Sequence, residues 1–234
     1  MAMLWDMGFG SLRADSLVAP SLGASLTGAV LLANLPQLII SFLYILYNGL
    51  FTSMYTAAEW MSFSRKRQPL RVTNPEGEQI STYWLQLPYA ISVPILVAMT
   101  LLHWLVSQSI FLASINFYRD GLELETSDAK VMGCGYSCAA IIFAIILGLM
   151  LVGMLVGSGF RRYPGGMPLA STCSAALSAA CHPPADDKEA AYKELRWGVV
   201  RGYSSTRVSL DGDFEHCSFT SQEAELPSRG RTYA

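Results

Sequence analysis

One ionisable side chain stands in the middle of an otherwise apolar stretch. His103 lies within the run LLHWLVSQS; in a helix, Ser107 four positions on shares its face and Gln108 is adjacent. An imidazole at membrane depth needs a polar partner, because the bilayer core supplies no water. We therefore expect a polar seam of His103, Ser107 and Gln108 against polar residues of another apolar segment, which are Asn34, Gln37 and Asn48.

Such a seam has two chemical interpretations. A neutral imidazole can hold helices together by hydrogen bonds, or it can lie on a path for an ion or a proton. We favour the first interpretation. A metal or haem ligand is less probable still, because no second histidine occurs at membrane depth to complete a ligand pair.

Two glycines, Gly153 and Gly157, have the GxxxG spacing. Small residues at this spacing let two helix backbones approach closely. The pair is compatible with self-association, but packing within the chain or chance is the simpler explanation, since glycine is frequent in membrane helices.

Cys134 and Cys138 are four residues apart at the start of an apolar run. This spacing at a helix start is awkward for a disulfide, and a metal site would need further ligands nearby. Structural thiols are therefore the favoured interpretation.

A basic cluster follows the first apolar segment and consists of Arg65, Lys66, Arg67 and Arg71. Basic residues beside a membrane end set orientation and attract anionic lipid, at about 1 kcal/mol per charge. Both roles are compatible with this cluster.

No catalytic fingerprint accompanies these residues. The chain has no GxSxG, P-loop, HExxH, paired CxxC or dinucleotide-binding motif. His182, near Asp186 and Asp187, fits a loop better than a catalytic pair. We expect neither an enzyme nor a bound cofactor.

The composition places these residues in a membrane protein. The 234 residues are 52% hydrophobic and only 15% charged, against about 25% charged in soluble chains. Residues 16–58 contain no Asp, Glu, Lys, Arg or His. The net charge of −2 gives no basic balance that would indicate a nucleic acid partner.

The apolar runs predict an all-α membrane protein with three transmembrane helices, at about 29–58, 88–113 and 138–160. Each is long enough for a bilayer core that needs roughly 20 helical residues. We expect residues 1–28 to form an interfacial or re-entrant lead-in, 29–160 the transmembrane region, and 161–234 a partly disordered cytoplasmic tail. Within the tail, 174–180 suggests one or two helical turns, and 195–201 with 214–220 a small β-hairpin.

Basic residues near the predicted helix ends set the orientation. Four follow the first span, two lie in the second loop, and Arg161 and Arg162 follow the third span. The positive-inside rule then makes the first loop and the C-terminal tail cytoplasmic, and the N-terminus and second loop external or luminal. Insertion of 163–181 as a fourth span would reverse the C-terminus, and we treat it as the less probable alternative.

Long blocks of the chain resemble the C-terminal part of a family of uncharacterised fungal multi-pass membrane proteins. These blocks include ANLPQLIISFLYILYNGLFT, LLHWLVSQSIFL, CGYSCAAIIFAIILG and GFRRYPGGMPLASTCSAALSAACHPP. The resemblance covers most of the chain. It implies longer relatives with more spans ahead of this region, so that this chain would be a truncated form, a partial gene model or a short paralogue. The resemblance implies no activity and no catalytic residues.

Two functions of different classes follow. The first is a structural, accessory or partner-binding membrane component that contacts lipid, and either copies of itself or other membrane helices. The second is a subunit or fragment of a transporter or channel, with His103, Gln108 and Asn48 on the path. A further alternative is an accessory membrane protein of a fungal metabolic pathway.

Overall fold

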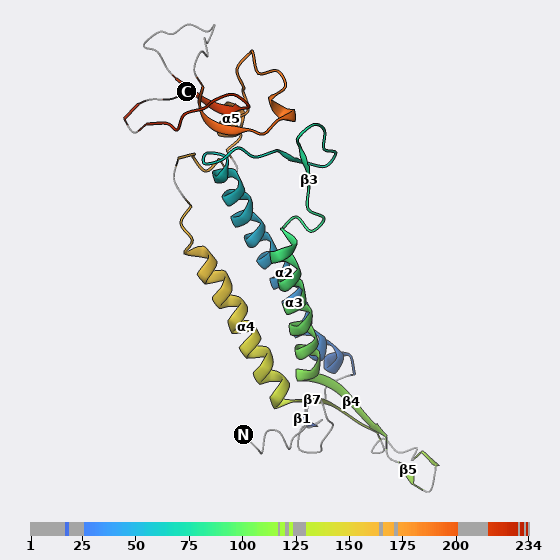
Figure 1. Cartoon of the computed structure of the whole chain (residues 1–234). Helices are drawn as coiled ribbons and strands as arrows, with labels where there is room; N and C mark the ends of the chain where they lie inside the picture. Colours follow the sequence, from blue (N-terminus) through green and yellow to red (C-terminus); the bar gives the residue numbers. More distant parts are fainter. Residues whose placement is uncertain are drawn as a thin grey trace. The chain divides into compact units, whose positions relative to one another are not determined.

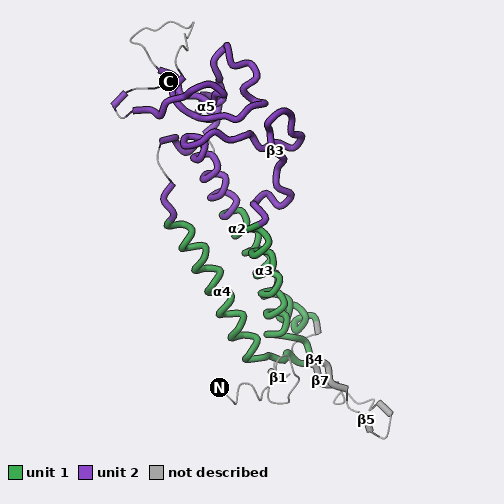
Figure 2. The backbone as a smooth tube through the Cα atoms, in the orientation of Figure 1, with its two compact units in different colours: residues 1–50, 90–160 green, residues 51–89, 161–234 purple. Residues whose placement is uncertain are grey.

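The structure is a computed structural model, and it describes residues 17–18, 26–116, 118–119, 122–123, 130–163, 166–170, 173–200, 215–228, 230–231 and 233. The chain forms two compact units, each built from two separate parts of the sequence (Figure 2). Unit 1 contains residues 1–50 and 90–160, and unit 2 contains residues 51–89 and 161–234. The segment between the first two long helices therefore shares a unit with the C-terminal segment. Of the lead-in predicted over 1–28, all but residues 17–18 and 26–28 lies outside the described residues.

Three long helices follow the predicted apolar runs (Figure 1). They are α2 (Leu26–Ser62), α3 (Tyr89–Ser109) and α4 (Cys138–Gly159), and all three are long and apolar enough to cross a membrane. Leu, Ile and Ala are the commonest residues of these runs, and no acidic residue occupies a first turn. Both α2 and α3 continue through an internal proline, Pro36 and Pro94.

The long helices carry large apolar side chains on their exposed surface. Phe42, Ile45 and Leu149 are each about two-thirds exposed, at 66%, 65% and 66%. Monomeric soluble proteins rarely leave large contiguous apolar surfaces open to water. The apolar side chains of these helices therefore serve mostly as an outer surface and only in part as a protein core.

Unit 1 contains a three-stranded sheet that the all-α prediction missed. Strands β4 (Ile110–Asn116) and β7 (Lys130–Tyr136) are antiparallel, with Ile110 opposite Tyr136 at one end and Asn116 opposite Lys130 at the other. Strand β1 (Leu17–Val18) pairs with the other edge of β7. The second span was predicted to reach Ala113, but α3 ends at Ser109. The prediction was too long because residues 110–113 are as apolar as the helix before them, although they pair as part of strand β4. Beyond them, β5 (Tyr118–Arg119) pairs with β6 (Leu122–Glu123).

Unit 2 contains the hairpin predicted in the tail. Strands β8 (Arg196–Val200) and β9 (His216–Thr220) pair antiparallel, with Trp197 opposite Phe219. This confirms the small β-hairpin, and each strand begins or ends within two residues of its predicted bound. The helix α5 (Ser174–Ala180) and a 3-10 helix, η4 (Ala190–Tyr192), precede the hairpin.

The hairpin packs on the end of α2 to form a core. Aromatic rings meet edge to face, with the Phe219 ring centroid 5.1 Å from that of Trp60 and 5.3 Å from that of Phe63. Such pairs stabilise by about 0.5–1.5 kcal/mol beyond the burial of their area. The buried members of the core are Met61, Phe63, Met167, Ala180, Ala190, Leu195, Trp197 and Phe219. A hairpin that would be marginal by itself is thus docked on a helix.

The first loop joins this core through backbone bonds. Gln68 exchanges two backbone hydrogen bonds with Leu195, each 2.9 Å long. Further along the loop, β2 (Arg71–Val72) pairs parallel with β3 (Ile80–Ser81). Between them, Gly77 has φ +63°, and a Cβ there would lie 2.7 Å from the carbonyl oxygen of Tyr192. Glycine is therefore required at this turn for conformation and for space.

Candidate functional site

The predicted polar seam is only partly assembled. His103, Ser107 and Gln108 are all half-buried on α3, but none of the three side chains makes a hydrogen bond within the described residues. Asn48, on α2, is half-buried too and has interactions of its own. The four residues thus lie on two of the long helices, but the three on α3 form no hydrogen bond with Asn48 among the described residues.

A different residue joins two of the long helices by a polar contact. The hydroxyl of Tyr47 on α2 donates a hydrogen bond of 3.1 Å to the carbonyl oxygen of Leu151 on α4. Tyr47 and Leu151 are 7% and 5% exposed. The sequence analysis missed this contact because its acceptor is a backbone oxygen. The only sequence signal is a tyrosine deep in an apolar run.

A groove of about 440 Å³ lies between α3 and α4. Its lining among the described residues consists of apolar and aromatic side chains, including Trp104, Leu105, Phe143 and Met150. His103 is not part of this lining. The groove therefore suits hydrocarbon and offers no polar route.

The two glycines of the GxxxG motif are exposed. A Cβ built on Gly153 or on Gly157 would meet no atom within 4 Å outside the helix's own backbone. Within the described residues, the close helix approach that these glycines permit is not used by another part of the chain.

The two cysteines near the start of α4 have separate positions. Cys134 is buried on β7, and its thiol lies 3.7 Å from the carbonyl oxygen of Ala29. Cys138 is the first residue of α4 and is half-buried. All five cysteines are free thiols, and the part of the chain that is described contains no group of three His, Cys, Asp or Glu suited to a metal.

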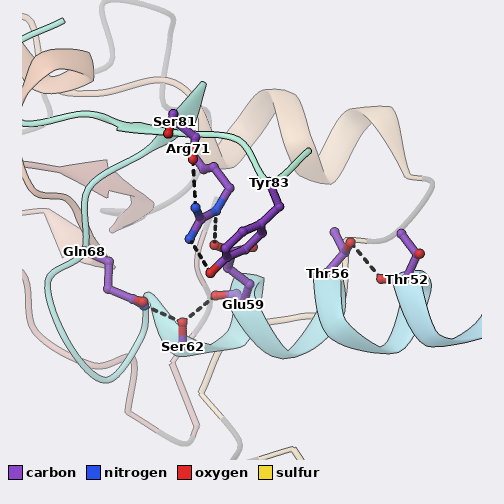
Figure 3. Close-up of polar contacts among 8 residues, drawn as sticks. All are labelled: Thr52, Thr56, Glu59, Ser62, Gln68, Arg71, Ser81 and Tyr83. Atoms are coloured by element: carbon purple, nitrogen blue, oxygen red, sulfur yellow. Dashed lines mark hydrogen bonds and ion pairs between the residues drawn. The ribbon is translucent and has the colours of Figure 1, made fainter. Parts of the chain in front are cut away.

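Arg71, in unit 2, forms the centre of a cluster at the end of α2 (Figure 3). Its Nε lies 3.2 Å from Glu59 Oε1, and its two terminal nitrogens donate to the carbonyl of Ser81 at 2.9 Å and to the hydroxyl of Tyr83 at 3.2 Å. The guanidinium carbon also lies 4.0 Å from the centre of the Tyr83 ring. Arg71 thus connects the last turn of α2 to the segment that leads into α3.

The other three basic residues of the predicted lipid cluster divide into two kinds. Arg67 donates hydrogen bonds to the carbonyl oxygens of Ser221 and Gln222, so that it ties the first loop to the C-terminal segment. Arg65 and Lys66 are exposed, and their side chains have no ion-pair partner among the described residues. Of the cluster, these two remain available to a ligand in solution or to a membrane surface.

Asp187 is the buried carboxylate of unit 2. It accepts hydrogen bonds from the hydroxyl of Thr220 at 2.7 Å, and from the backbone nitrogen and hydroxyl of Ser221 at 2.7 and 2.6 Å. Burial alone would raise the pKa of this carboxyl, but the hydrogen bonds from Ser221 and Thr220 outweigh it and hold the pKa below its ordinary value. His182 instead contacts the carbonyl of Ser178 at 2.5 Å. Asp187 is therefore an anchor for the end of β9.

Unit 2 contains an apolar pocket of about 310 Å³ that is partly open at the surface. Two tryptophans, Trp60 from α2 and Trp197 from β8, line it together with Cys217 from β9. The Trp60 indole is fixed because its nitrogen donates to the carbonyl of Pro168 at 3.2 Å. Burial, with a smaller effect of Glu215, raises the pKa of the Cys217 thiol to about 11, so that it stays protonated and unreactive at neutral pH. The other lining residues are Gly166, Met167, Pro168, Ala170, Ala176, Ala179, Ala180, Pro227 and Tyr233.

Comparison with known proteins gives a family and no activity. No curated protein and no solved structure matches the chain. The model of a domain of unknown function, DUF8419, matches residues 1–233. Since this match covers nearly the whole sequence, the chain belongs to the DUF8419 family.

Proposed function

We propose that the chain is an integral membrane protein in which α2, α3 and α4 span the bilayer. The observation that carries this proposal is the exposed apolar surface of the three helices, exemplified by Phe42 and Leu149. A helix rises about 1.5 Å per residue, so that the 21 residues of α3 reach the roughly 30 Å of a hydrocarbon core. The resemblance to fungal multi-pass membrane proteins also supports membrane insertion.

The proposed orientation has the first loop and the C-terminal segment in the cytoplasm. Unit 2 combines these two segments in one core, which supports their lying on the same side of the membrane. The basic residues that follow α2 and α4 favour the cytoplasmic side. The alternative of a fourth span is disfavoured because α5 has seven residues, about 10 Å of helix, and its Ala180 is buried in the core of unit 2.

Within this frame, the function that we favour is that of a structural or partner-binding membrane component. In this role, the exposed side chains of Arg65 and Lys66 would contact anionic lipid. We propose no reaction for the protein. Transport and a supporting role in a fungal pathway remain alternatives, and of these the first is tested at His103 below.

Membrane insertion is tested by washing membranes with alkaline carbonate, after which the protein should stay in the pellet. Orientation is tested with a membrane-impermeant maleimide, because Cys173 and Cys181 are exposed in unit 2 while Cys134 is buried. Both should react only after the cells are permeabilised, and the signal gained on permeabilisation should vanish in the double variant Cys173→Ser, Cys181→Ser. Cys138 is half-buried at the start of α4, on the side proposed as external, so its label on intact cells is compatible with the proposal. Extraction by carbonate would refute insertion. Labelling of intact cells that the double variant loses would refute only the orientation.

Self-association through α4 is the proposed partner interaction that the structure leaves open. Gly153→Leu adds a large side chain at a position where a Cβ meets no atom of the described residues within 4 Å, so it should reduce cross-linked dimers while expression stays unchanged. A Cβ on Gly148 likewise meets no atom within 4 Å, and Gly148 lies outside the GxxxG pair, so Gly148→Leu is the matched control. Equal dimer yields in both variants would exclude this interface.

A further inference from the structure

The apolar pocket of unit 2 exists because several of its lining residues are small. Protein interiors are close-packed and contain few voids larger than a water molecule. A pocket of about 310 Å³ here lies at the lower end of the range of small-ligand sites, about 300–1,000 Å³. The wall formed by α5 consists of Ala176, Ala179 and Ala180, and Gly166 adds a position without a side chain. These small residues leave the space that larger core residues would fill.

The chemistry of the lining selects an uncharged ligand. Among the described residues, no Asp, Glu, Lys, Arg or His lines the pocket. The indole nitrogen of Trp60 is already bonded to Pro168, and the hydroxyl of Tyr233 is bonded to the backbone nitrogen of Ser228 at 2.8 Å. Cys217 contributes a protonated thiol. An ion or a sugar would therefore lose its hydration without gaining partners, whereas hydrocarbon loses nothing.

The position of the pocket indicates where such a ligand comes from. Trp60 lies in the last turn of α2, where an indole suits the interface between lipid and water. Because the same residue forms one wall of the pocket, the pocket adjoins the end of the first proposed span. The proposed bilayer is then the nearest source of hydrocarbon.

We propose that the pocket between α5, Trp60 and Trp197 binds one hydrocarbon chain of a membrane lipid. This inference rests on the proposed function, since it requires the bilayer at the end of α2. The small volume suits a single chain and excludes a whole phospholipid. In this proposal, unit 2 is a lipid-binding module.

The test uses the full chain in phosphatidylcholine vesicles that contain a phosphatidylcholine with a photoactivatable diazirine in one acyl chain. After irradiation, labelled peptides are mapped by mass spectrometry. We expect label on α2–α4, which face the bilayer, and additional label on lining residues of the pocket such as Trp197 and Cys217. Ala176→Phe, which fills the pocket from α5, should abolish only the additional label.

Ala175→Phe is the matched control, because Ala175 is exposed on the same helix and does not line the pocket. A second filling variant, Ala179→Phe, guards against misfolding of the first, and unchanged trypsin resistance of unit 2 shows that a variant is folded. Label on the helices with none in the pocket, or pocket label that both filling variants retain, would overturn this inference and leave the membrane proposal intact. Absence of label on the helices would overturn both.

Discussion

The guanidinium of Arg71 lies 3.2 Å from the carboxylate of Glu59, twelve residues earlier in the chain. Both side chains are mostly buried, at 21% and 30% exposure. Because the same guanidinium also bonds Ser81 and Tyr83, its removal would leave several groups without their partner. The pair is thus a joint between the end of α2 and the loop that follows it (Figure 3).

Arg71→Ala should destabilise unit 2 by about 1–3 kcal/mol, as expected when hydrogen bonds to a charged group are lost. The measurement is the rate of chymotryptic cleavage within residues 63–89 of the detergent-solubilised protein, which should rise. Arg65→Ala is the control, since Arg65 is exposed and has no ion-pair partner among the described residues. Equal cleavage rates in the two variants would contradict the role assigned to Arg71.

Asp187→Asn should weaken the attachment of the 182–190 segment to the end of β9, at a cost of about 1–3 kcal/mol near neutral pH. The pKa of Asp187 is lowered in the folded state, so its contribution is complete above the ordinary carboxyl pKa of about 3.9 and is lost as the pH falls through the folded pKa. The acid unfolding of unit 2, followed by protease sensitivity, should therefore depend less on pH in the variant.

Asp186→Asn is the control for this experiment. Asp186 is the exposed neighbour of Asp187, and its side chain makes no hydrogen bond within the described residues. The two variants remove the same charge from adjacent positions. If they shift the acid transition by the same amount, charge alone explains the effect and the hydrogen bonds of Asp187 do not contribute.

Tyr47→Phe removes the hydroxyl that bonds the carbonyl oxygen of Leu151. Hydrogen bonds between membrane helices contribute about 0.6 kcal/mol on average, so we expect a small loss of thermal stability in detergent. Tyr44→Phe supplies the comparison, because Tyr44 lies one turn earlier on α2 and its hydroxyl makes no hydrogen bond among the described residues. A larger effect at Tyr44 would contradict the contact.

His103→Asn distinguishes packing from transport. No side-chain hydrogen bond of His103 occurs in the described part of the chain, so the variant should assemble and express like the wild type. Ion or proton flux into vesicles that contain the protein is the second measurement. A loss of flux at normal expression would support the transport alternative, and unchanged flux would support the structural one.

Hydropathy predicts the long helices well because it measures what they expose. The run that becomes α2 contains no charged residue before Glu59, and the run that becomes α4 contains none. The length of such a run is then enough to indicate a membrane span. The same measure fails at Ser109. Residues 110–113 are as apolar as the helix before them, and their pairing with 133–136 becomes visible only in three dimensions.

The sites were less predictable than the helices. The basic cluster was visible in the sequence, but the role of Arg71 depends on Glu59 and Tyr83, and that of Arg67 on carbonyls more than 150 residues away. The pocket could not be predicted either, because its walls come from α2, α5, β8 and β9 and are joined by the fold alone. Local patterns carry no information about such distant contacts.

The discontinuity of unit 2 has a consequence for biogenesis. The ribosome delivers Phe63 and Leu70 long before Leu195 and Phe219, with two hydrophobic helices synthesised in between. The apolar side chains of the 63–89 segment therefore stay exposed until the C-terminal segment has been synthesised. Nascent chains arrested just after α4 should then bind chaperones at the 63–89 segment, and these chaperones should dissociate once the full chain is released.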